Sequence, residues 1–111
     1  MQPEVLKFLY DIQVSCQSIF EYLGDNRDFE FYLKNKQLRR AVERELEIIG
    51  EACNNLLKID PTIPIDNARK IVDARNWVIH GYDKVDDVII WGIISRDLAI
   101  LQKQVENLII S

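Results

Sequence analysis

LRRAVERELEIIGEACNNLL, residues 38 to 57, repeats its apolar residues with the spacing of an α-helix. One face of such a helix carries apolar side chains, and the opposite face carries charged and polar ones. The apolar face comprises Leu38, Ala41, Val42, Ile49, Ala52, Cys53 and Leu56, and the polar face comprises Arg44, Glu47, Glu51 and Asn54. The stretch therefore predicts a long two-faced helix.

The same periodicity recurs on both sides of this stretch. Upstream, an apolar stripe with Pro3 near its start and Gly24 at its stop predicts a helix over about residues 3 to 23. That stripe comprises Val5, Leu9, Ile12, Cys16, Ile19 and Leu23. The following DNRDFEFYLKNKQ (25–37) has a weak pattern in which a helix could begin early.

Two further helices are predicted downstream. The loop KIDPTIP (58–64) interrupts the chain with two prolines, and helices follow over about 66 to 80 and 86 to 109. Gly81 is well placed as a stop for the first of them. Apolar positions of the second include Val88, Ile89, Ile93, Leu101, Val105 and Leu108.

No segment alternates like a β-strand, and no linker or repeat interrupts the chain. We therefore predict an all-α fold in a single domain over 1–111, most simply an antiparallel four-helix up-and-down bundle.

Composition narrows the functional classes. The net charge of −4 argues against a broad basic surface, so contact with RNA would have to involve a few arginines locally. No apolar run reaches the roughly 18 residues that a membrane span needs. The N-terminal segment carries charges inside its apolar pattern, unlike a signal peptide, so a cytoplasmic protein is expected.

The cysteines and the single histidine leave little for a metal site. Cys16 and Cys53 both fall in apolar stripes and are expected to be buried free thiols. The chain has no CxxC or HExxH spacing, and its four glycines are isolated, so no phosphate loop is present. Neither a metal nor a cofactor is expected.

The segment RNWVIHGY (75–82) combines several reactive side chains. Arg75 falls inside the apolar stripe of the third helix, which comprises Ile65, Ala68, Ile71, Val72 and Ile79. A guanidinium there must find partners, because a buried unpaired charge is costly. It could pair with a carboxylate of another helix, extend to the edge of the core, or bind a substrate.

His80 lies in the last helical turn, where the helix dipole favours its protonated form. Asn76 and His80 share one side of the helix with Arg69 and Asp73. Such a histidine is either a helix-end residue or an acid-base group. Arginine stabilises phosphate oxyanions, histidine exchanges protons near neutral pH, and asparagine can orient either. These groups suit metal-free RNA cleavage, in which the substrate supplies its own 2′-hydroxyl nucleophile.

Two surface features also leave alternatives open. Trp77 lies opposite the apolar stripe, which indicates either a partner or dimer contact or a covering loop. Glu47 and Glu51, one turn apart on the polar face, are either solvated or meet arginines across an interface.

These motifs resemble the HepT-like toxins of the HEPN superfamily. Arg75, His80 and Tyr82 match the RX4HXY motif of that family. AVERELEIIGEACNNL (41–56), IP (63–64), ARNWVIHGYDKVD (74–86) and VIIW (88–91) resemble it in order and spacing, over roughly residues 38 to 101.

The resemblance implies an antiparallel helical bundle, a homodimer and metal-independent ribonuclease activity. It also implies a minimal nucleotidyltransferase (MNT) as antitoxin. Arg75 and His80 would be catalytic, Asn76 would support them, and Tyr82 would receive AMP from the MNT partner. A dimer would bring both copies of Arg75 and of His80 to one cleft.

The leading hypothesis is therefore a HepT-like ribonuclease toxin. Arg75 would stabilise the pentacoordinate phosphate, His80 would transfer protons, and Glu47, Glu51 and Asp73 are candidate supporting residues. The first alternative is a non-catalytic helical adaptor or substrate-binding subunit for a nucleotidyltransferase. The second is a nucleotide-binding protein that uses Arg75 and Arg69.

Overall fold

Helices form all the regular secondary structure in the part of the chain that the structure describes. The structure is a computed structural model that describes residues 2–25, 27–80 and 87–110, with the side chains of 75–80 outside this description. Its elements are α1 (Pro3–Leu23), α2 (Phe29–Lys34), α3 (Lys36–Ile59), α4 (Ala68–His80), α5 (Asp87–Gly92), a π-helical turn (Ile93–Asp97) and α6 (Leu98–Ile110). The predicted all-α fold is confirmed.

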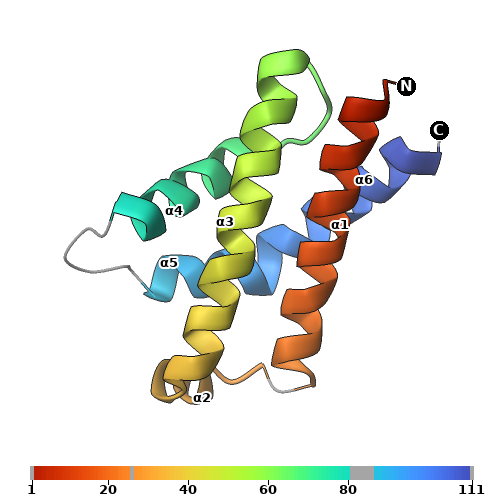
Figure 1. Cartoon of the computed structure of the whole chain (residues 1–111). Helices are drawn as coiled ribbons and strands as arrows, with labels where there is room; N and C mark the ends of the chain where they lie inside the picture. The colour runs from red at the N-terminus through yellow and green to blue at the C-terminus, as the bar shows by residue number, and fades with distance from the viewer. Residues whose placement is uncertain (1, 26, 81–86, 111) are drawn as a thin grey trace.

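The helices form an antiparallel bundle (Figure 1). α1 and α3 run side by side in opposite directions, and α4 turns back along the other side of α3. The segment from α5 to α6 crosses behind α3 and α1 and packs on α1, so that the two chain ends lie near each other. α4 is thus an outer helix, held mainly by α3. No helix among the described residues is both long and apolar enough to cross a membrane.

The core is built from the apolar stripes of these helices. The α1 stripe is confirmed, and Gly24, at φ 58°, ends this helix in a backbone conformation that glycine adopts readily. The fully buried side chains of α1 and α3 include Leu9, Ile12, Cys16, Ile19, Val42, Leu46, Ile49, Cys53 and Leu56. Leu46 completes the α3 stripe between Val42 and Ile49.

The weakly patterned stretch after α1 contains the short helix α2. Asp28 caps its start by accepting a hydrogen bond from the Glu30 backbone N–H at 3.0 Å. Tyr32 is fully buried, and the ring centroid of Trp91 lies 5.3 Å from its own. α2 therefore links the start of α3 to the end of α5.

The last helix differs from the continuous helix that periodicity predicted. Its backbone includes a π turn, in which the Leu98 N–H bonds to the Ile93 carbonyl five residues back. Ile93 and Ile94 are both buried, whereas Val88 is 66% exposed and Ile89 is 39% exposed. These two apolar positions near the start of the helix do not join the core.

The third predicted helix begins at Ala68 rather than at residue 66. Asp66 instead contacts Gln104 of α6, with its carboxylate accepting from Nε2 at 3.1 Å and its N–H donating to Oε1 at 3.2 Å. The predicted stop at Gly81 lies outside the described residues.

Candidate active site

α4 carries the arginine and the histidine of the RX4HXY motif. Arg75 and Asn76 lie past the middle of α4, and His80 is its last residue. Ala68, Ile71, Val72 and Ala74 are buried and attach this helix to the core. The side chains of Arg75, Asn76, Trp77 and His80 fall outside the description, as does the whole of Tyr82. Their proposed roles therefore remain predictions.

A groove borders α4 on the side of Asp73. This α4–α5 groove has a volume of about 530 Å³ and is lined by Lys70, Asp73, Val88, Ile89, Gly92, Ile93, Arg96 and Asp97. Asn76 and His80 follow Asp73 by three and seven positions, so helical geometry puts their Cα atoms on the same side of α4. Asn76 and His80 are two of the three residues predicted to be catalytic. By helix register they lie on the side of α4 that carries Asp73, which lines this groove.

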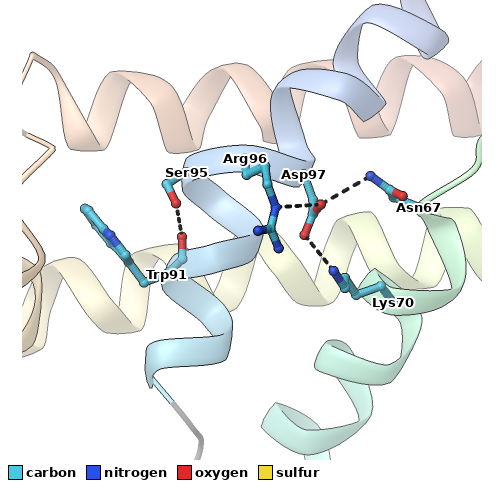
Figure 2. A network of polar contacts seen from close by, with 6 residues as sticks. All are labelled: Asn67, Lys70, Trp91, Ser95, Arg96 and Asp97. Carbon is cyan, nitrogen blue, oxygen red and sulfur yellow. Dashed lines mark hydrogen bonds and ion pairs between the residues drawn. The ribbon is translucent and has the colours of Figure 1, made fainter.

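Asp97, one of the residues that line the groove, lies within a polar network (Figure 2). Its side chain is only 5% exposed. Lys70 Nζ lies 3.3 Å from Oδ2, and Arg96 Nε lies 3.5 Å from Oδ1. Asn67 donates from Nδ2 to Oδ1 at 3.3 Å. A buried carboxylate is costly unless it is paired and hydrogen-bonded, and these contacts supply that compensation.

Glu47 and Glu51 line a second groove, between α1 and α3. Its other lining residues are Lys7, Phe8, Asp11, Arg44, Ile48 and Ala52. Glu47 is half-buried and pairs with Arg44 of its own helix at 3.2 Å. Glu51 is exposed and accepts a hydrogen bond from Asn55 at 3.5 Å. The three candidate supporting residues are therefore divided between two grooves, with Asp73 alone in the α4–α5 groove.

The sequence motifs do not point to Lys70, Arg96 or Asp97. The sequence nevertheless sets Asp97 at the edge of an apolar stripe. It stands directly before Leu98 and four positions before Leu101, and both leucines are buried. A carboxylate at the edge of an apolar stripe requires partners from a neighbouring element. Asn67 and Lys70 provide them from the start of α4.

The cysteines are buried free thiols, as predicted. Burial raises the pKa of both Cys16 and Cys53 to about 12. Only a thiolate is an effective nucleophile, so neither residue is poised for covalent catalysis near neutral pH. Among the described residues, no group of three or more histidine, cysteine, aspartate or glutamate side chains is arranged to hold a metal ion.

Comparison with known proteins agrees with the motif. The family model described as "Ribonuclease HepT-like" matches residues 12–108. A protein of Methanocaldococcus jannaschii named "Putative RNase MJ1380" is 36% identical over 107 residues, covering 93% of this chain and 94% of the relative. "Probable ribonuclease HepT" of Thermococcus cleftensis is 33% identical over 105 residues, covering 91% of this chain and 92% of the relative. No solved structure matches the chain.

The chain thus combines a helical bundle with Arg75 and His80 in the last part of α4, and it matches the family model over almost its full length. This chain belongs to the HepT-like ribonuclease family.

Proposed function

We propose that this chain is a metal-independent RNA endonuclease that acts as the toxin of a toxin–antitoxin pair. The observation that carries the proposal is the intact Arg75, His80 and Tyr82 spacing in a member of the HepT-like ribonuclease family. Arg75 and His80 both lie in the last part of α4, and the helix register puts His80 on the side of Asp73, which lines the α4–α5 groove; this supports a substrate site at that end of the helix.

The proposed reaction uses the RNA's own 2′-hydroxyl as nucleophile. His80 removes the 2′-hydroxyl proton or protonates the departing 5′-oxygen, and Arg75 stabilises the charge on the phosphate oxygens. A bond forms between the 2′-oxygen and phosphorus while the bond from phosphorus to the 5′-oxygen breaks. The products are a 2′,3′-cyclic phosphate and a 5′-hydroxyl. Asn76 would orient His80 or the phosphate.

The proposed active form is a homodimer. Two copies of Arg75 and His80 at a twofold axis would concentrate positive charge locally on a protein whose net charge is −4. Trp77, which helical periodicity sets opposite the α4 stripe, would supply apolar contact area for such an interface.

The proposed antitoxin is a minimal nucleotidyltransferase that transfers AMP to Tyr82. The added phosphate would bring negative charge close to Arg75 and compete with the RNA phosphate for it. Toxicity would then fall when the partner and ATP are present.

RNA cleavage by purified protein in the presence of EDTA tests the proposal. We expect fragments with 2′,3′-cyclic phosphate ends, and we expect His80→Ala to abolish cleavage while the helical circular dichroism signal is retained. Lys103→Ala, at an exposed position of α6, is the matched control and should cleave at the parental rate. If His80→Ala cuts as fast as the parent, the assignment of His80 is wrong. A folded parent protein that cuts no RNA but binds a nucleotidyltransferase would instead support the adaptor hypothesis.

A further inference from the structure

The contacts of Asp97 connect two elements that are distant in sequence. Asp97 ends the π turn, whereas Asn67 directly precedes α4 and Lys70 belongs to its first turn. Figure 2 shows the Asp97 carboxylate between these side chains and that of Arg96. The network therefore joins the start of the helix that carries the motif to the final helical segment of the chain.

The π turn, whose last residue is Asp97, makes further contacts with its neighbours. In the same turn Ser95 donates a hydrogen bond to the Trp91 carbonyl. Trp91 in turn packs against Phe29 and Tyr32, with ring centroids 5.7 and 5.3 Å away. The segment that presents Asp97 is thus anchored to α2 by aromatic contacts as well as to α6 by the continuing helix.

The apolar contacts made by the first half of α4, where the structure describes its side chains, are less directional. Ala68, Ile71 and Val72 attach it to the core through buried apolar side chains. Hydrophobic burial is non-directional, so such contacts resist separation of the helices more than sliding or rotation. Hydrogen bonds and ion pairs to one buried carboxylate restrict the axial position and the rotation of the helix.

We infer that Asp97 is a positioning residue that sets where α4 presents Arg75 and His80. This inference rests on the proposed ribonuclease function. His80 lies ten positions beyond Lys70, which corresponds to about 15 Å along the helix axis. A tilt of about 4° at the Asp97 end would therefore move the His80 end by about 1 Å. A displacement of about 1 Å at reacting groups can reduce the rate about 100-fold.

Asp97→Asn tests the inference, because asparagine preserves the size of the side chain and one carbonyl acceptor but removes the charge that Lys70 and Arg96 share. We expect kcat for RNA cleavage to fall about tenfold or more while KM changes by less than about twofold, since Arg75 and His80 are retained and a small displacement mainly affects their alignment with the reacting atoms. Lys70→Met should give a smaller loss in kcat. The double variant should match Asp97→Asn alone, because both changes break the same contact.

Hydrogen exchange supplies a readout that does not depend on activity. The amides of α4 in Asp97→Asn should exchange about tenfold faster than in the parent, whereas those of α1 should be unchanged. Two control variants separate positioning from other effects. Asp25→Asn makes the same charge change at an exposed loop position, and Ile19→Val loosens the α1 core. Neither should selectively affect α4 exchange or reduce kcat.

Unchanged α4 exchange in Asp97→Asn would overturn the inference, as would an unchanged kcat in a protein that cleaves RNA. An equal loss of kcat in Ile19→Val at similar stability would also overturn it, since Asp97 would then contribute only general stability. If the parent protein cuts no RNA, the ribonuclease proposal fails, and the α4 exchange comparison alone decides whether Asp97 sets the position of α4.

Discussion

The Asn35 side-chain oxygen accepts a hydrogen bond from the Leu38 backbone N–H at 3.0 Å. The Asn35 backbone N–H bonds in turn to the Tyr32 carbonyl at 3.3 Å. Asn35 therefore ends α2 and begins α3. Its extended backbone conformation, φ −105° and ψ 91°, is what a helix N-cap residue requires. The angle between α2 and α3 therefore depends on the backbone conformation of this residue.

Replacement of this cap should destabilise the fold. We expect Asn35→Ala to lower the free energy of unfolding by about 1 kcal/mol, because alanine leaves an N–H of the first α3 turn without its side-chain acceptor. Asn35→Asp should retain most of the stability, since a carboxylate oxygen can accept the same bond. Urea denaturation followed by circular dichroism measures both, with Gln37→Ala as an exposed control on the same helix. Equal stability of Asn35→Ala and the parent would contradict the capping role.

Removal of the Tyr32 hydroxyl should stabilise the protein. This buried hydroxyl has no hydrogen-bond partner among the described residues. A buried polar group without a partner costs about 1–3 kcal/mol, so Tyr32→Phe should raise the free energy of unfolding by about 1 kcal/mol while the ring still packs on Trp91. Tyr10→Phe, at a half-exposed ring, should change stability by less than about 0.5 kcal/mol in the same denaturation experiment. A loss of stability in Tyr32→Phe would mean that the hydroxyl is bonded.

Alkaline pH should destabilise the protein through its buried thiols. Burial raises the pKa of Cys16 and Cys53 to about 12, above the usual value of about 8.5 for an unfolded chain. Thiolates therefore form first in the unfolded state, and the stability contributed by the neutral thiols is complete below about pH 8.5 and is lost as pH rises toward 12. In denaturant titrations, the free energy of unfolding of the Cys16→Ala/Cys53→Ala variant should fall less steeply between pH 8 and 10.5 than that of the parent. An equally steep decline would assign the effect to other groups.

Dimerisation can be tested by light scattering. At micromolar concentration, the expected mass is twice the 13.0 kDa of the chain. Trp77→Ala should shift the equilibrium toward the monomer, because an indole placed at the proposed interface would supply a large apolar contact. A monomer at every concentration tested would rule out a catalytic site shared by two copies of this chain.

Modification of Tyr82 can be tested by mass spectrometry. After co-expression with a minimal nucleotidyltransferase, the peptide that contains Tyr82 should carry one or more AMP groups, and Tyr82→Phe should abolish the addition. Tyr10→Phe serves as the control and should leave the modification intact. Full neutralisation of toxicity with Tyr82 unmodified would indicate that the antitoxin acts by covering the active site.

The sequence predicted the long helices well, because their boundaries and faces follow from apolar spacing and from strong local signals. Pro3 and Gly24 mark the two ends of α1, and the buried face of α3 follows its period. α2 is only six residues long, too short for its period to be visible, and its ends depend on side-chain caps at Asp28 and Asn35. Its existence therefore could not be read from apolar spacing.

The parts that the sequence did not predict depend on contacts between distant elements. The π turn has no compositional signature of its own, and Asp97 gained its partners only when the fold brought Asn67 and Lys70 near it. The motif positions on α4 were identified by resemblance, because a histidine before a glycine is compatible with an ordinary helix end as well as with catalysis. The division of Glu47 and Asp73 between two grooves likewise required three-dimensional information.

The π turn also gives the chain a point at which one residue can be lost without rotating the helices on either side. Each residue of an α-helix turns the following side chains by about 100°, and the wider π turn takes up one additional residue. Deletion of one residue within Ile93–Asp97 should therefore restore a uniform α-helix in which α5 and α6 keep nearly the same faces toward the core. Deletion of one residue within α6 itself would instead turn α5 by about 100° relative to the rest of α6 and so reshape the α4–α5 groove, which Val88, Ile89 and Gly92 of α5 line.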